Sequence, residues 1–143
     1  MTANPCPFCG GQRLAFANDS LAIEHAGLTT LVAGLSGWRC AALDCAEILL
    51  DDDSQRRYAE ASDALVLAAR RNAGEELRRI RRKLKLTQAE AARLTGGGHN
   101  AFSRYEKGLT QALPAVINLF RLLDRHPEML AELAADNRPQ RAA

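Results

Sequence analysis

The sequence lacks the features that would direct it to a membrane or out of the cell. No segment of its 143 residues approaches the roughly 20 consecutive apolar residues that a membrane-spanning helix needs. The chain also shows no basic start followed by an apolar run, so we expect no secretory signal. These absences predict a cytoplasmic protein without a membrane partner, whose thiols are kept reduced.

Motifs of catalysis are absent as well. The sequence contains no pattern that pairs a nucleophile with a base, and the glycines of residues 96–98 lack the Lys of a phosphate-binding loop. We therefore expect no enzymatic activity. A zinc-dependent enzyme is the one catalytic class left to weigh, because the chain contains cysteines.

Cysteine is missing from the second half of the chain. Cys6 and Cys9 form a Cys-x-x-C pair, and 30 residues later come Cys40 and Cys45, which are separated by four residues. Reduced thiols at these spacings favour a tetrahedral site for one structural Zn(II) per chain, bound by all four thiolates. Four thiolates close the coordination shell, whereas a catalytic zinc keeps an open position, so this site disfavours a zinc enzyme.

These cysteines have alternative uses to a zinc site. The wide second gap requires a bulge around Leu43 and Asp44 if both of its cysteines bind one metal. A redox Cys-x-x-C lacks the strand-helix-strand context of thioredoxins, and structural free thiols are a further alternative. His25 is a conceivable substitute ligand, although its position fits a surface strand better.

Charge is distributed unevenly along the chain. Residues 1–70 contain 5 basic and 9 acidic residues, a net charge of −4, whereas residues 71–143 contain 14 basic and 8 acidic residues, a net charge of +6. This break predicts two domains, at residues 1–72 and 73–143. Because domains of about 70 residues are marginal with a hydrophobic core alone, we expect zinc to stabilise the first and a partner subunit the second.

The predicted fold class is α+β, with a small zinc-clamped N-terminal β-sheet domain that includes one helix. Apolar stretches interrupted by Asn18-Asp19, Gly27 and Gly34 predict short strands at residues 13–16, 21–25 and 29–35. A helix over residues 54–72 follows, and Gly74 is expected to end it. The acidic residues 51–53 fit a helix cap better than a metal site.

The C-terminal domain is predicted to be all-α, with five helices around a helix-turn-helix. The expected helices cover residues 75–85, 87–96 and 100–107, and two further helices open at Pro114 and Pro127. The helix at Pro114 is apolar around most of its circumference, which implies burial on two sides. We therefore expect a two-fold homodimer through this domain, and residues 137–143 are expected to fray.

The helix pair of residues 87–107 gives the clearest functional pattern. Thr87 is a plausible N-cap, and Gly96 ends the first helix before a short turn. On the second helix, one face carries Asn100 and Arg104 together with Ser103 and Lys107, and the opposite face is apolar. Since Asn pairs with adenine and Arg with guanine in the major groove, we expect Asn100 and Arg104 to read bases of double-stranded DNA.

Further residues are predicted to contact the DNA backbone. Six basic residues lie between Arg78 and Lys85, immediately before the helix pair. The predicted backbone contacts are Gln88, Ser103, Lys107, Arg81 and Lys83. An ordinary two-helix hairpin with a solvated polar face is the alternative, but the clustered positive charge argues against it. The expected target is a palindromic operator.

The cysteine pairs, the linker, and the sequences GGGHNAFSRYEKG at residues 96–108 and LLDRHPEML at residues 122–130 together resemble the MqsA-type (YgiT-type) antitoxins of bacterial toxin-antitoxin systems. The resemblance covers nearly the whole chain and is most specific at residues 96–108. It departs at the second cysteine pair, where the family has a two-residue gap.

This resemblance implies a non-enzymatic antitoxin with two functions. The N-terminal zinc domain would neutralise a small basic ribonuclease toxin that cleaves messenger RNA, and the C-terminal domain would dimerise and repress a palindromic operator. Asn100 and Arg104 would match the base-reading residues, and the four cysteines the zinc ligands. A stand-alone zinc-containing transcriptional regulator without a toxin partner remains an alternative, because toxin contact surfaces are not readable from one sequence.

Overall fold

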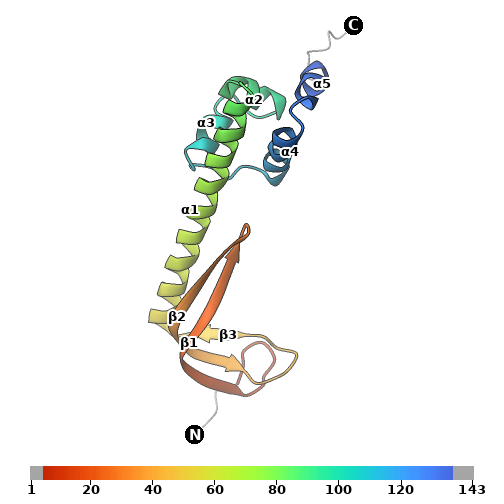
Figure 1. Ribbon diagram of the computed structural model, residues 1–143. Coiled ribbons are helices and arrows are strands. Elements are labelled where there is room, and N and C mark those ends of the chain that lie inside the picture. Colours follow the sequence, from red (N-terminus) through yellow and green to blue (C-terminus); the bar gives the residue numbers. More distant parts are fainter. Residues whose placement is uncertain (1–4, 137–143) are drawn as a thin grey trace. The chain divides into compact units, whose positions relative to one another are not determined.

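The structure is a computed structural model that describes residues 5–136. These residues group into two compact units, which divide between Val66 and Leu67. The elements are β1 (Arg13–His25), β2 (Leu28–Cys40), β3 (Ile48–Leu50), α1 (Asp52–Lys83), α2 (Gln88–Leu94), α3 (Ala101–Glu106), α4 (Pro114–Arg125) and α5 (Met129–Asp136) (Figure 1). The α+β class is therefore confirmed. In the described part of the chain, no helix is both long and apolar enough to cross a membrane. The predicted fraying of residues 137–143 falls outside the described residues.

The first unit is built on one antiparallel sheet in the order β1-β2-β3. The prediction of three short strands is wrong, because β1 and β2 form one long hairpin that turns at Ala26 and Gly27 (Figure 1). Asn18 and Gly34 have φ angles of 55° and 70°, yet neither ends its strand. The pairing shifts register between Phe16 and Leu21 instead. Such a bulge absorbs irregular residues while the ladder continues on both sides.

The core of the first unit lies between the hairpin and the first half of α1. Ile23, Val32 and Leu35 of the sheet are buried together with Leu65 of α1. Tyr58 and Ala61 pack against this core from the same helix, because residues three, four and seven apart lie on one helix face. The start of α1 is capped as expected, because the carboxylate of Asp51 accepts a hydrogen bond from the backbone N–H of Ser54 at 2.8 Å.

Helix α1 is continuous over 32 residues, so the prediction of two helices that separate at Gly74 is wrong. Gly74 is buried, and a Cβ atom added to it would lie 2.2 Å from the carbonyl oxygen of Tyr105. This glycine therefore allows the end of α3 to approach the backbone of α1 closely, and it does not terminate the helix. The described residues form five helices for this reason, where the sequence predicted six.

The second unit contains the second half of α1 and helices α2 to α5. Its buried core consists of Leu77, Ile80, Ala91, Ala92, Phe102, Ala112, Val116 and Phe120. The rings of Phe102 on α3 and Phe120 on α4 lie 5.0 Å apart between centroids, and this contact packs the helix pair against α4. Pro114 opens α4 as predicted. Leu113 and Leu122 remain exposed in the single chain.

Candidate metal centre and nucleic-acid interface

The four cysteines of the first unit come together as predicted. All four Sγ atoms lie within 4.8 Å of one another. Cys6 Sγ is 3.9 Å from Cys45 Sγ, and Cys9 Sγ is 3.4 Å from Cys40 Sγ. A tetrahedral zinc with Zn–S bonds of about 2.3 Å places its sulfurs about 3.8 Å apart. The four thiols are therefore close enough together to hold one such ion.

Two tight backbone turns aim the sulfurs at this point. In the first, the N–H of Cys6 donates to the carbonyl of Gly11 at 2.8 Å, and Gly10 adopts a φ angle of 74°. A Cβ atom on Gly11 would lie 3.3 Å from the sulfurs of both Cys9 and Cys40, so a larger residue at this position would crowd the two thiols.

The second turn accommodates the longer gap between Cys40 and Cys45. The N–H of Cys45 donates to the carbonyl of Ala42 at 3.1 Å. Leu43 and Asp44 then point into solvent, so the bulge that the spacing requires lies outside the thiol cluster. His25 is exposed on β1 beside the hairpin turn and takes no part in the cluster.

The thiols influence one another's ionisation. Hydrogen bonds from the backbone N–H groups of Cys9 and Phe8 lower the pKa of Cys6 to about 7. The backbone N–H of Glu47 lowers the pKa of Cys45, but burial and the three neighbouring thiols outweigh it and raise that pKa to about 12. Crowded thiols cannot all ionise alone, and a divalent cation among them removes the repulsion between thiolates.

Helices α2 and α3 form the predicted helix-turn-helix. Thr87 caps α2 in a reciprocal arrangement, since its hydroxyl accepts the N–H of Glu90 at 3.1 Å and its own N–H donates to the Glu90 carboxylate at 2.7 Å. Gly96 has a φ angle of 67° and turns the chain toward α3. On α3, Phe102 is fully buried and Tyr105 is half-buried, as their predicted apolar face requires.

Asn100 and Arg104 lie at the exposed side of this helix. Asn100 occupies the N-cap of α3, but its side chain makes no capping hydrogen bond. Within residues 5–136, neither side chain has an ion pair or a hydrogen-bond partner, so the amide and the guanidinium both face solvent. They border a shallow depression lined by Gly98, His99, Asn100, Ala101, Arg104, Tyr105 and Thr110.

The residues predicted to contact the DNA backbone have different surroundings. Lys107 is exposed at the end of α3, and Ser103 is half-buried. Arg81 and Gln88 both bind the carboxylate of Glu106: Arg81 Nη2 donates to Oε2 at 3.0 Å, and Gln88 Nε2 donates to the same oxygen at 2.9 Å. Burial raises the pKa of Glu106, but these hydrogen bonds outweigh it and hold that pKa below its usual range.

Lys83 also has a carboxylate partner. Its Nζ atom donates to Asp124 Oδ1 at 2.6 Å, and Arg79 Nη2 donates to the other oxygen at 2.9 Å. Nearby, the guanidinium of Arg121 forms a two-pronged pair with Glu76. These contacts join α1 to α4, and the backbone roles expected for Arg81 and Lys83 remain predictions.

Two comparisons with known proteins bear on this arrangement. The family described as the antitoxin component of bacterial toxin-antitoxin system, MqsA, matches residues 4–134. This chain belongs to the MqsA antitoxin family. Antitoxin MqsA of Escherichia coli (strain K12) is 35% identical over 130 residues, which cover 90% of this chain and 98% of that protein. The resemblance seen in the sequence is confirmed over almost the full length, and it assigns the chain to the antitoxins of toxin-antitoxin systems.

The basic run of this MqsA-family chain, residues 78–85, divides between paired and unpaired side chains in a way that was not predicted from the sequence. Arg78 and Arg82 make no ion pair among the described residues, whereas their neighbours Arg79, Arg81 and Lys83 each bind a carboxylate. The signal was available in part, because residues four apart share a helix face. The carboxylate partners were not predictable, since they come from α3 and α4.

Proposed function

We propose that this antitoxin has two activities that reside in its two units. The N-terminal unit, held by one structural Zn(II), binds and neutralises a cognate toxin that cleaves messenger RNA. The C-terminal unit forms a homodimer that binds a palindromic operator and represses transcription. The DNA half of this proposal depends on Asn100, at the N-cap of α3, and Arg104, one turn further along it. Both side chains are exposed and have no partner among residues 5–136.

Zn(II) fits the thiol cluster in donor type, donor number and spacing. Cys6, Cys9, Cys40 and Cys45 would supply four thiolates, and four thiolates leave no open coordination position for a substrate. The ion would therefore cross-link the two turns and stabilise the sheet that they flank, in a structural role and not a catalytic one.

The helix-turn-helix supports base reading by its buried and exposed faces. The capped start of α2, the turn at Gly96 and the burial of Phe102 fix α3 against the core. The amide of Asn100 can pair with adenine and the guanidinium of Arg104 with guanine. Because they lie about one helical turn apart, they can reach neighbouring base pairs. Ser103 and Lys107, on the same face, would contact the backbone.

A homodimer is supported by apolar side chains that the second unit leaves in solvent. Leu109, Leu113, Leu122 and Met129 are all more than a third exposed. Apolar area of this kind is typical of an interface between subunits. A two-fold dimer would present two copies of α3 to half-sites about one helical turn of DNA apart.

The first unit offers both charge and apolar area to a toxin. Its acidic side chains Asp44, Asp52 and Asp63 are exposed, which would attract a basic ribonuclease. Large apolar side chains are exposed as well, namely Phe8, Leu14, Leu31, Trp38, Leu43 and Ile48. Interfaces need such apolar residues at their core, and they are costly on a protein without a partner.

A separation-of-function variant tests the proposal in the full chain. Asn100→Ala combined with Arg104→Ala should increase expression of a reporter gene placed under the operator, because each contact contributes about 1–3 kcal/mol of base discrimination. The same variant should protect cells from the toxin encoded beside the gene as well as the wild type does, with equal protein levels verified by immunoblot. In binding assays, the variant should lose more affinity for operator DNA than for random DNA.

Each half of the proposal can fail separately. Equal losses on operator and random DNA would mean that Asn100 and Arg104 do not read bases. If no adjacent gene is toxic, or if the wild-type chain gives no protection from it, the toxin-neutralising half fails. The stand-alone regulator would then be the better description of the DNA-binding half.

A further inference from the structure

We propose that Arg78, Arg82 and Lys107 form a binding site for one phosphate of the DNA backbone, beside the recognition helix α3. This inference rests on the proposed DNA-binding function and assigns the backbone contact to different residues of α1 than the sequence predicted. It follows from the division of the basic run into three groups.

The basic residues of α1 point in three directions. Arg79 and Lys83 are four residues apart and both bind Asp124 of α4. Arg81 has a side chain only 12% exposed and binds Glu106 of α3. Arg78 and Arg82 are also four residues apart, which places them one turn from each other and about 100° around the helix from Arg79 and Lys83.

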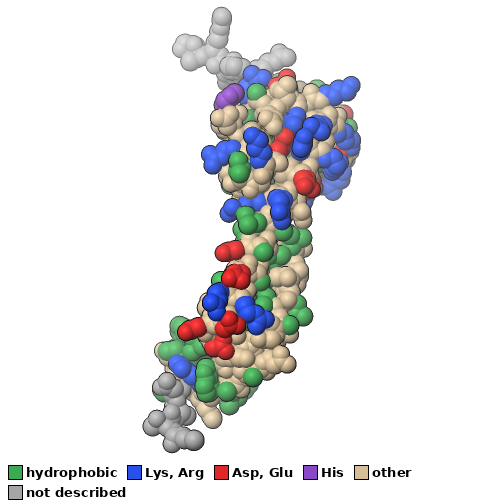
Figure 2. Space-filling view, turned by 90° about the vertical axis from the view of Figure 1, so that its left-hand side faces the viewer, with side chains coloured by type: hydrophobic (Ala, Val, Ile, Leu, Met, Phe, Trp, Pro, Cys, Tyr) green, Lys and Arg blue, Asp and Glu red, His purple; other side chains and the backbone are tan. Residues whose placement is uncertain are grey.

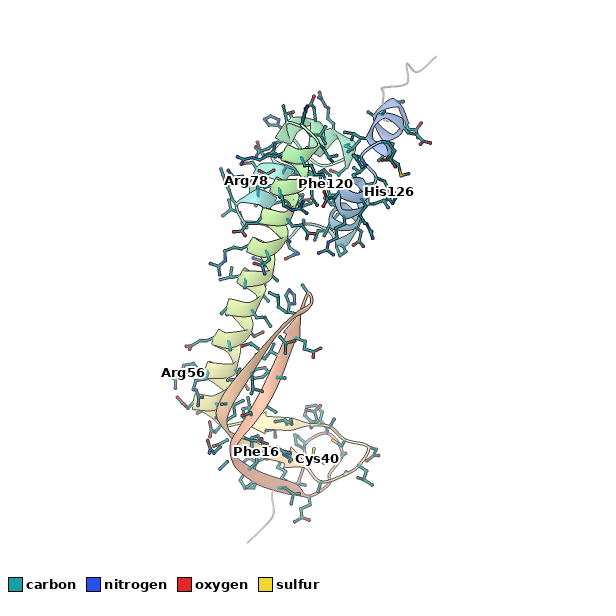
Figure 3. All side chains as sticks on the ribbon, in the orientation of Figure 1. Phe16, Cys40, Arg56, Arg78, Phe120 and His126 are labelled. Atoms are coloured by element: carbon teal, nitrogen blue, oxygen red, sulfur yellow. The ribbon has the colours of Figure 1, made fainter. Side chains whose placement is uncertain are left out.

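Arg78 and Arg82 face the helix that carries the base-reading residues. Together with Lys107 they line a recess of about 200 Å³, and Arg81, Gln88 and Glu106 complete its lining. Arg78 lies on the side of α1 next to α3, and many Lys and Arg side chains gather on this face of the second unit (Figures 2 and 3).

The recess has a surplus of positive charge that no described residue neutralises. Four cations and one carboxylate line it, a net charge of +3. The carboxylate of Glu106 is 5% exposed and already holds Arg81 and Gln88, although Arg78 is close enough to lower its pKa further. Arg78, Arg82 and Lys107 therefore remain for an external anion, and their guanidinium and ammonium groups are the donors that phosphate prefers.

The position of the recess favours a DNA phosphate over other anions. Lys107 belongs to the same helix face as Asn100 and Arg104, so a duplex that places its bases against those two side chains passes the end of α3. A cation at that end meets the backbone that flanks the bases being read. Glu106, Arg81 and Gln88 act as positioning residues, because they fix the end of α3 to α1 and α2.

Two double variants of the full chain, matched in charge, test this site. Arg78→Gln with Arg82→Gln removes two charges from the recess, and Arg79→Gln with Lys83→Gln removes two charges from the face that binds α4. The affinities for operator and for random duplex are measured by fluorescence anisotropy over a range of salt concentrations. Melting curves verify that both variants are folded.

The recess variant should lose about tenfold or more in affinity for both duplexes at low salt, while its preference for operator over random DNA stays unchanged. Its plot of log affinity against log salt should be shallower by about 1, which corresponds to one lost phosphate contact. Lys107→Gln, on the other helix, should give the same change of slope. The Arg79 and Lys83 control should keep the slope of the wild type.

The site would be overturned if the recess variant keeps the wild-type slope and affinity, or if the control loses as much slope as the recess variant. Either result assigns the salt dependence to other cations or to net charge alone. Failure of the proposed function looks different, because the wild type itself would then show no preference for operator DNA.

Discussion

The two units of this antitoxin are close in size but differ in what holds them together. Of the six largest fully buried side chains in the described residues, only Leu35 belongs to the first unit. The other five belong to the second unit: Phe102, Phe120, Leu77, Ile80 and Leu123. Each such side chain stabilises the fold by about 1.5–3 kcal/mol when it leaves water. The helical unit therefore has a core on which it can fold, whereas we expect the sheet unit to depend on the proposed zinc ion between its cysteines.

Removal of zinc should have the largest effect and should act on one unit alone. Structural zinc sites contribute on the order of 10 kcal/mol, since binding free energy is folding free energy in such sites. We expect the reduced, purified chain to contain about one zinc. A chelator should then collapse the amide NMR signals of the sheet, while the signals of Phe102 and Phe120 stay in place.

Two substitutions control the zinc experiment. Cys45→Ser should abolish stoichiometric zinc, and His25→Ala should retain it, because His25 lies outside the thiol cluster. A wild-type preparation without zinc, or a chelated protein whose first unit gives an unchanged spectrum, would contradict the claim that the sheet unit, unlike the helical unit, needs zinc to stay folded.

Two glycines test the packing of each unit separately, with a smaller expected effect. An added Cβ would lie 2.2 Å from the Tyr105 carbonyl oxygen at Gly74, and 2.1 Å from the Leu49 carbonyl oxygen at Gly37. Gly→Ala inside a free helix usually stabilises by about 1 kcal/mol. We expect Gly74→Ala instead to destabilise the helical unit by about 1–3 kcal/mol through overpacking, and Gly37→Ala to destabilise only the sheet unit.

Urea unfolding, followed by NMR signals specific to each unit, measures both changes. Gly98→Ala is the matched control within the helical unit, because nothing lies within 4 Å of the added Cβ. It should change the unfolding free energy by less than about 0.5 kcal/mol. A stabilising effect of Gly74→Ala would mean that α1 and α3 do not approach each other as closely as described.

Features that depend on neighbours in sequence could be predicted from the sequence. The cap at Thr87, the opening of α4 at Pro114 and the opposite faces of α3 follow from local geometry and periodicity. The clustering of the four cysteines followed from the chemistry of reduced thiols, even though the second pair has an unusual spacing.

Features that depend on tertiary contacts could not be predicted in this way. In the sequence, Gly74 looks like the end of a helix. In the fold, glycine is needed there because the carbonyl group of Tyr105, 31 residues further along the chain, lies against it. Asn18 and Gly34 have the appearance of strand ends, but paired strands tolerate them as bulges. The basic run of α1 divides according to Asp124 and Glu106, which only the fold brings near.

The smallest expected effect concerns the ion pairs that join α1 to α4 in the helical unit. Hydrogen bonds from Arg79 and Lys83 lower the pKa of Asp124 from 3.8 to about 2. Because the pKa is lower in the folded state, this stabilisation is complete above about pH 4 and is lost as the pH falls toward 2. In the wild type, the urea midpoint of the helical unit should therefore fall as the pH is lowered from about 4 to 2. Asp124→Asn should make this fall smaller, and Asp136→Asn should leave it unchanged. At pH 7 and moderate salt the Asp124→Asn variant should stay folded, since pairs near the surface contribute little. Unfolding of this variant at pH 7 would show that charge, and not the core around Phe102 and Phe120, holds the helical unit together.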